Sequence, residues 1–259
     1  MKYISGRLPP NSNTKQARRR GFDTQTKSAS DYFTQTSIGS HIHTRAMDPA
    51  NRPPEIEKFH QQLKAWTVLH LKREYCVLEA GCGTGAVLRW ISPEVKLVVG
   101  IDNAHLKVDE SQDMVLREHL MNVQVMMGDF FHLHRQFERH PFDVICLYSN
   151  TLGNFPGMEA KLLRALAKGL KKDGQILLQL YGDKSIQPRW NFYSTIGWPN
   201  LRYNKDEKAF RAKGDGFDFV SLVFDEPKIC QIVNEAGLEL AEMKKVNIGY
   251  FVAVKQQVY

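Results

Sequence analysis

One glycine-rich segment contains the residue types and spacing that most clearly suggest chemistry. It reads Val77-Leu78-Glu79-Ala80-Gly81-Cys82-Gly83-Thr84-Gly85, so an apolar stretch runs directly into three closely spaced glycines. Glycines adopt backbone angles that other residues avoid, and they let a ligand approach the main chain. Free N–H groups at the start of a following helix favour a negatively charged or electron-rich ligand. We therefore predict a buried strand, a ligand-binding turn and a helix that opens at Gly85.

An acidic residue accompanies this turn. Asp102 follows Gly81 by 21 residues, at the end of the next apolar stretch. A carboxylate at that place can accept both hydroxyl hydrogens of a ribose. The run Gly81-x-Gly83-x-x-Ala86 also satisfies the dinucleotide fingerprint, so an NAD-dependent enzyme stays open as an alternative. Gly85 and Glu79 favour a different ligand, because a carboxylate before the first glycine would repel a pyrophosphate but suits an ammonium group.

The elements that position these residues alternate between strands and helices. Apolar runs predict strands at 76–80, 96–102, 123–129, 142–149 and 175–181, the last after a turn at 172–174. Helices are predicted after Pro53-Pro54, at Gly85, and over about 108–120 and 157–170. Strands that are apolar on both faces and separated by helices indicate a parallel sheet covered on both sides.

The C-terminal part departs from this alternation. Pro227 suits a first helical position, and Gly237 suits the stop that follows the helix. Strands at 238–246 and 249–255 are joined by Asn247-Ile248 alone, which allows only an antiparallel hairpin. We therefore expect an α/β fold with a Rossmann-like, mostly parallel sheet whose last strand is reversed.

Composition and charge set limits on the class of protein. Apolar residues make up 42% of the 259 residues and charged residues 24%, so a packed core can form. Of the net charge of +7, +5 lies in residues 1–31, which are rich in polar residues. We predict a disordered basic tail at 1–31, a helical cap at 32–74 and a main domain at 75–259. The absence of a long apolar run and of an N-terminal apolar segment argues against membrane association and secretion, and favours the cytoplasm. A nuclear or organellar location is the alternative that the basic tail leaves open.

The stretch 76–255 resembles the class I S-adenosylmethionine-dependent methyltransferases, whose seven-stranded sheet ends in an antiparallel strand. Glu79–Gly85 resembles the first motif of that family, and Val98–Asp102 resembles the second, whose acid holds the ribose. Met127–Phe130 and Phe142–Leu147 resemble the third and fourth motifs, and Lys172–Leu177 resembles the loop and strand that follow. The resemblance implies S-adenosylmethionine as the cofactor and predicts these residues as its binding site: Glu79, Ala80, Gly81, Cys82, Gly83, Asp102, Asn103, Asp129, Phe130 and Leu147.

The resemblance also directs attention to the acceptor. The segment 148–156 resembles its counterpart in small-molecule N-methyltransferases and lacks the Asn/Asp-Pro-Pro-aromatic pattern of many enzymes that act on nucleic acids or proteins. Tyr148 and Asn150 are therefore predicted catalytic residues, although the loop could instead cap the next helix. The long region 182–224 is predicted to cover the active site as a lid, with RNA binding or a satellite core as alternatives. The predicted substrate residues are Tyr32, Tyr181, Trp190 and Tyr193.

These observations favour methyl transfer to a small molecule, with nitrogen preferred as the acceptor atom. An RNA or protein methyltransferase that docks through the basic tail is one alternative. A protein that binds the cofactor without catalysis is another. No metal is predicted, because His132, His134 and His140 lie in a polar segment beside two arginines and lack a ligand set.

Overall fold

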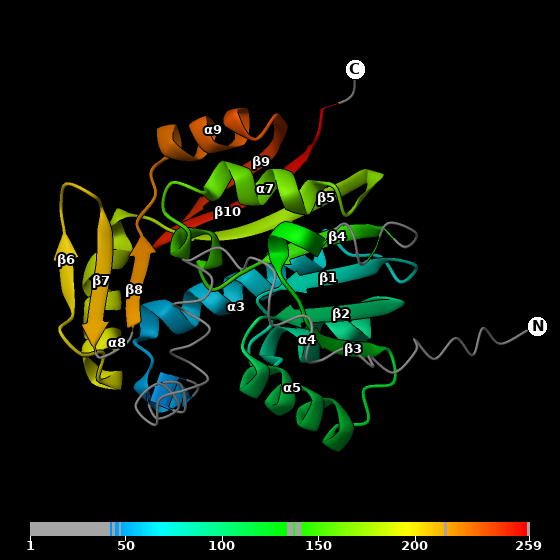
Figure 1. Ribbon diagram of the computed structural model, residues 1–259, viewed down its shortest axis with the longest axis horizontal. Helices are drawn as coiled ribbons and strands as arrows, with labels where there is room; N and C mark the ends of the chain where they lie inside the picture. Colours follow the sequence, from blue (N-terminus) through cyan, green and yellow to red (C-terminus); the bar gives the residue numbers. More distant parts are fainter. Residues whose placement is uncertain are drawn as a thin grey trace, which may run out of the picture.

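The computed structural model describes residues 42, 45–46, 48–133, 137, 141–214 and 217–257. Its centre is a seven-stranded sheet in the order β3-β2-β1-β4-β5-β10-β9 (Figure 1). Strand β10 is antiparallel to both of its neighbours, and the central pairs are parallel, as predicted. The strands are β1 (Cys76–Ala80), β2 (Leu97–Asp102), β3 (Val123–Met127), β4 (Phe142–Leu147), β5 (Leu170–Tyr181), β9 (Leu238–Val246) and β10 (Gly249–Gln256).

Helices cover both faces of this sheet because alternate strand residues point to opposite sides. Val77 and Val144 face one core with α3 (Pro54–Val68), α4 (Ala86–Ile91) and α5 (His105–Arg117). Leu78 and Ile145 face the other core with α7 (Glu159–Ala167) and α9 (Glu226–Glu235). Short 3-10 helices complete the connections: η2 (Pro49–Asn51), η3 (Ser92–Glu94), η4 (Phe130–His132), η5 (Thr151–Asn154) and η6 (Asp183–Ser185). None of the described helices is long and apolar enough to cross a membrane.

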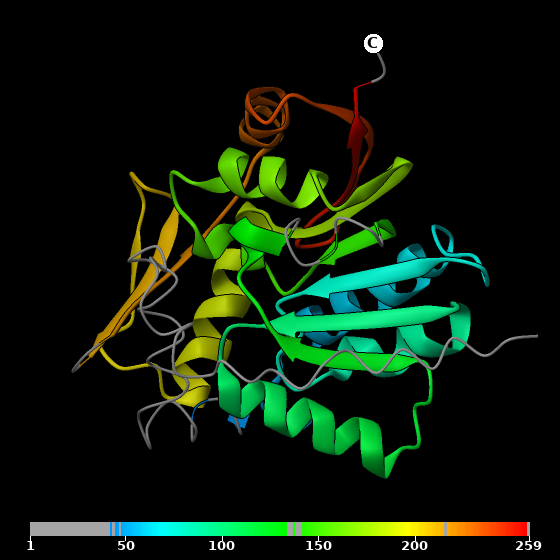
Figure 2. The same cartoon turned by 45° about the vertical axis from the view of Figure 1, so that its right-hand side comes forward.

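The region 182–224 forms a structural unit of its own beside the sheet. Helix α8 (Ile186–Ile196) precedes a three-stranded antiparallel sheet of β6 (Arg202–Asn204), β7 (Ala209–Gly214) and β8 (Phe217–Leu222). Tyr193, Trp198 and Phe210 belong to a separate small core of this unit. Figure 2 shows α8, in yellow, standing between the arrowheads of the central strands and the small sheet.

Several boundaries differ from those predicted. Strand β5 begins at Leu170, so the predicted turn at 172–174 is part of the strand, next to an irregular register between β4 and β5. A Cβ on Gly174 would lie 2.9 Å from the carbonyl oxygen of Phe142, so glycine allows β4 to approach closely. Helix α5 covers 105–117 instead of 108–120, and α7 covers 159–167 instead of 157–170.

The hairpin β9–β10 meets the end of β5 through a close backbone contact. Gly249 pairs with Tyr181, and a Cβ on Gly249 would overlap the carbonyl oxygen of Leu180 and lie 2.9 Å from the ring of Phe59.

We expect Gly249→Ala to lower the free energy of unfolding by about 2 kcal/mol, measured by urea denaturation, because the backbone of β10 must move. The matched control is Gly237→Ala, whose Cβ would meet open space at a φ of +69°, and its expected cost is about 1 kcal/mol. Equal losses in the two variants would contradict the close contact.

Candidate cofactor and acceptor site

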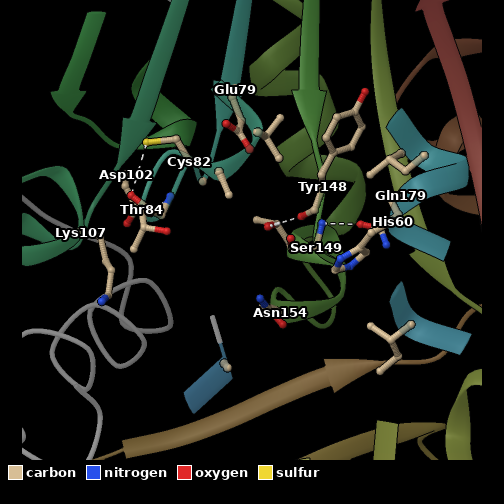
Figure 3. A pocket seen from close by; sticks show the side chains of 18 of the residues that line it. His60, Glu79, Cys82, Thr84, Asp102, Lys107, Tyr148, Ser149, Asn154 and Gln179 are labelled. Carbon is tan, nitrogen blue, oxygen red and sulfur yellow. Dashed lines mark hydrogen bonds between the residues drawn. The ribbon is translucent and has the colours of Figure 1, made fainter. Parts of the chain in front are cut away.

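A cavity of about 580 Å³ opens at the carboxyl ends of β1, β2, β4 and β5. Helices α3, α4 and α8 contribute further walls. Figure 3 shows Asp102 and Lys107 at one end of the cavity, His60 and Gln179 at the other, and Glu79 between them. The site therefore lies where parallel α/β sheets bind ligands, outside the strand ends and between β1 and β4.

The glycine turn after β1 has the strained geometry that its sequence suggests. The N–H groups of Gly81 and Cys82 both donate to the carbonyl oxygen of Ile101, at 2.7 and 3.0 Å. Gly83 and Gly85 have φ angles of +53° and +83°, in the left-handed region that favours glycine. A Cβ on Gly85 would collide with Met114 and Ser111, whereas one on Gly83 would meet open space. The turn is therefore packed tightly against α5 at Gly85, whereas its backbone at Gly83 is open to the cavity.

Asp102 holds this turn in place from the end of β2. Its two carboxylate oxygens accept hydrogen bonds from the N–H groups of Gly83 and Ala104, at 2.9 and 3.0 Å. Burial raises the pKa of Asp102, and the two backbone N–H groups oppose that rise. Each carboxylate oxygen has a second lone pair. Asp102 can thus order the loop and still accept hydrogen bonds from a ligand.

Glu79 is the most unusual group in the cavity. It is 3% exposed, and its Oε2 atom is buried without a hydrogen-bond partner. Burial, together with the negative charge of Asp102, raises the pKa of Glu79 well above its ordinary value. A positively charged ligand group beside Glu79 would relieve both effects. The residues present therefore fit a cofactor that combines a ribose with a cationic amino-acid part, which is the chemistry of S-adenosylmethionine.

The far end of the cavity contains two polar residues that sequence reasoning missed. His60 projects from α3, and burial together with the positive charge of Arg52 lowers the pKa of His60 to about 4. Gln179 is fully buried; its Oε1 accepts from the N–H of Ser149 at 2.6 Å, and its Nε2 has no hydrogen-bond partner. The only sequence signal was a lone amide within the apolar run of β5. The structure thus brings a neutral imidazole and a free donor to one wall.

The hydroxyl of Tyr148 does not have the position that the predicted catalytic role requires. The residue lines the cavity, but its hydroxyl shares a 2.7 Å hydrogen bond with the hydroxyl of Thr67 in the core. Figure 3 shows the ring turned away from the cavity. Burial raises the pKa of Tyr148 well above its ordinary value. Its hydroxyl is therefore a packing contact with α3 and does not point at a ligand.

Asn150 also has a different position from the one expected, because it does not line the cavity. It adopts a φ of +58°, and its Nδ2 donates to Ser221 Oγ at 2.9 Å and to the carbonyl oxygen of Leu222 at 3.0 Å. Its Oδ1 accepts from the N–H of Tyr181 at 3.0 Å. The buried carboxamide thus joins the loop after β4 to the end of β5 and to β8, which is an anchoring role.

The remaining predicted residues divide into those that line the cavity and those that do not. The lining includes Gly81, Cys82, Gly83, Asn103, Phe130, Tyr181 and Tyr193, in addition to Glu79 and Asp102. Ala80 and Leu147 are fully buried beneath it. The carboxylate of Asp129 binds the N–H of Phe131 and the ring of His132, and Trp190 lies 38% exposed outside the lining. Tyr32 lies outside the described residues.

The metal expectation concerns three histidines, of which the structure describes only His132. His134 and His140 lie outside the described part of the chain. Within the part that is described, no three His, Cys, Asp or Glu side chains gather as metal ligands would.

The raised pKa of Glu79 has a consequence for stability. Rising pH ionises Glu79 in the unfolded chain before it does so in the folded protein, so the folded state loses stability between the two pKa values. We expect Glu79→Gln to stabilise the ligand-free protein by about 1 kcal/mol at about pH 8, and less at about pH 5, in urea denaturation. The exposed-site control Glu74→Gln should show no such pH dependence. A gain that is equal at both pH values would contradict the assignment.

Comparisons with known proteins agree with this geometry. Residues 77–174 match a family model described as a methyltransferase domain. A methyltransferase from Clostridium acetobutylicum, described as S-adenosylmethionine-dependent, is 14% identical, with coverage of 85% of this chain and 99% of its own and a TM-score of 0.59. The CcbJ methyltransferase from Streptomyces caelestis is 16% identical, and the match covers 79% of this chain and 97% of its own chain, with a TM-score of 0.61.

A third solved structure has the same fold. It is the magnesium protoporphyrin IX methyltransferase from Synechocystis PCC 6803 with bound S-adenosylmethionine, 15% identical, with coverage of 92% of this chain and 100% of its own and a TM-score of 0.61. A search of curated protein sequences found no match. At these identities the structural likeness concerns the fold, and the family model identifies the domain. Residues 77–174 thus match a methyltransferase domain, and the chain shares its fold with solved methyltransferase structures.

Proposed function

We propose that this protein is an S-adenosylmethionine-dependent methyltransferase that methylates a nitrogen atom of a small molecule. The observation that carries the proposal is a walled cavity with an unpartnered carboxylate, Glu79, at its centre and an aromatic wall beyond it. The carboxylate suits the cationic part of the cofactor. The aromatic wall, which includes Tyr181, Tyr193 and Trp198, suits a compact acceptor better than a polymer.

The residues that would hold the cofactor surround the glycine turn. Glu79 would accept from the ammonium group, and Asp102 would accept from the ribose hydroxyls while it keeps Gly83 in place. Phe130 lines the cavity beside the third motif and would pack against the adenine ring. When bound, S-adenosylmethionine supplies a methyl group on a positively charged sulfonium. The protein contributes mainly positioning and the exclusion of water.

The acceptor end suits an uncharged nitrogen. A protonated amine has no free electron pair, so a nitrogen acceptor must be neutral to attack. The surroundings that lower the pKa of His60 to about 4 are burial and the charge of Arg52, and they would likewise disfavour a protonated amine. His60 itself stays neutral and could accept a hydrogen bond from the N–H of the acceptor. These features would keep an amine acceptor in its neutral, nucleophilic form.

The direct test is a transfer assay with a labelled methyl donor. The full chain is incubated with labelled S-adenosylmethionine and a cell extract, and the products are separated into small-molecule, RNA and protein fractions. We expect label in the small-molecule fraction, on nitrogen. Label confined to RNA or protein would overturn the acceptor class, and cofactor binding without formation of S-adenosylhomocysteine would indicate a binding protein.

The ribose assignment can be tested by Asp102→Ala. Loss of the carboxylate removes two ribose hydrogen bonds and releases Gly83, so we expect S-adenosylhomocysteine to bind about 1–3 kcal/mol more weakly in titration calorimetry. Asp109→Ala removes an exposed carboxylate of α5 and serves as the control, with unchanged affinity expected. Unchanged affinity in a folded Asp102→Ala protein would contradict the assignment.

A further inference from the structure

The two ends of the cavity differ in charge. The carboxylates Glu79 and Asp102 belong to the end where the cofactor is proposed to bind, together with Lys107, which is paired with Glu110 at 2.9 Å. The opposite end is lined by Arg52 and Lys64, with Glu57 as its acidic residue. A second ligand that enters this end therefore meets a different electrostatic environment from that of the cofactor.

Arg52 acts on the groups that would surround an acceptor. Its side chain is 17% exposed and lies 3.4 Å from Glu57. Burial and the positive charge of Arg52 together lower the pKa of His60, and the same charge acts on Tyr181, whose pKa burial raises. Arg52 lines the same cavity as His60 and Tyr181, so a ligand held there would lie near its guanidinium.

A second guanidinium lies behind the same wall. Arg189 is fully buried, 4.6 Å from the ring centroid of Tyr181 and 5.3 Å from that of Tyr193. Its hydrogen bonds run to neutral groups, namely the carbonyl oxygen of Leu222 and the hydroxyls of Tyr193 and Ser221. Among the described residues, no carboxylate forms an ion pair with Arg189. Its charge is therefore not cancelled locally, and it adds to the positive potential at the wall.

The wall also offers a hydrogen-bond donor, the side-chain amide of Gln179, which has no partner within hydrogen-bonding distance among the described residues. Gln179 Nε2 is buried without a partner, while the Oε1 atom of the same side chain is held by Ser149. A rotation of the carboxamide that exchanged Oε1 and Nε2 would break this hydrogen bond. The Gln179 amide lies beside Tyr181 and lines the same cavity, so the donor lies among the aromatic residues of the wall. A buried donor without a partner is costly, and a ligand oxygen would satisfy it.

We infer that the acceptor is a small, flat molecule that carries a carboxylate, which Arg52 binds while Gln179 Nε2 donates to an oxygen of the same molecule. The inference rests on the proposed function and adds the chemical class of its substrate. The flat shape follows from the rings of Tyr181, Tyr193 and Trp198 in the lining. A carboxylate fits better than a phosphate because the neighbouring Glu57 opposes a doubly charged group.

The test uses the full chain saturated with S-adenosylhomocysteine and a matched series of ring compounds: benzoate, benzamide, benzylamine and phenyl phosphate. Binding is measured by titration calorimetry. We expect benzoate to bind at millimolar concentrations or better, and about tenfold more tightly than benzamide or benzylamine. Equal or tighter binding of any other member of the series would overturn the inference. Failure of all four compounds to bind would also overturn it.

Two variants with opposite expected effects identify the residue responsible. Arg52→Gln should weaken benzoate about tenfold and leave benzamide unchanged, whereas Glu57→Gln should strengthen benzoate because it removes the opposing charge. Lys58→Gln removes an exposed charge from α3, the helix that also carries Glu57, at a position outside the cavity lining. It should not change the affinity for benzoate or benzamide. If Arg52→Gln does not fold, Glu57→Gln decides: benzoate binding that is unchanged or weaker in that variant would refute the role of Arg52.

The controls separate this inference from the function on which it rests. S-adenosylhomocysteine is titrated first, in the absence of any ring compound. Failure of that titration would refute the cofactor site and therefore the proposed function. A normal cofactor titration followed by no preference for benzoate would refute only the acceptor class.

Discussion

A buried carboxylate without a partner is the constraint on which the rest of the site depends. Glu79 lies at the centre of the cavity, and no group of the described residues lies within hydrogen-bonding distance of its Oε2 atom. Such an arrangement is unfavourable in the free protein, since burial and the negative charge of Asp102 both raise the pKa of Glu79. Folding has already buried this carboxylate at an electrostatic cost. A cationic ligand that binds beside it relieves that cost, which increases its affinity, as in other preorganised sites.

The second requirement is a wall that closes the cavity without belonging to the central sheet. Helix α8 and the small sheet provide it, and two buried polar side chains attach them. Asn150 joins the loop after β4 to Tyr181 and to β8, and Arg189 joins α8 to β8 beneath the aromatic rings. Buried polar groups of this kind tolerate few alternative arrangements, because each lost hydrogen bond leaves an unsatisfied group. The aromatic wall is therefore held at a defined distance from the glycine turn.

The polarity of the cavity then separates its two ligands. Carboxylates surround the end proposed for the sulfonium and ammonium of the cofactor, and guanidinium groups lie near the end proposed for the acceptor. A cofactor that entered the wrong end would place its cation near Arg52 and Arg189. An acceptor with a negative charge would be repelled by Glu79 and Asp102. Under the proposed function, charge would set the order of the two ligands along the cavity, and backbone N–H groups and aromatic rings would set their orientation.

The sequence by itself determined the features that depend on local pattern. The apolar runs, the three glycines and the spacing to Asp102 predicted the strand, turn and helix of the cofactor end, and the two-residue link at Asn247-Ile248 predicted the reversed last strand. Only the tertiary structure decided which way the side chains of the acceptor end point. Tyr148 turns its hydroxyl to Thr67 and Asn150 faces Ser221, residues distant in the chain, while His60 and Gln179 reach the cavity from positions that belong to no predicted motif. The physical reason is that a turn is specified by the backbone preferences of adjacent residues, whereas the direction of a buried polar side chain is set by the partners that packing brings to it.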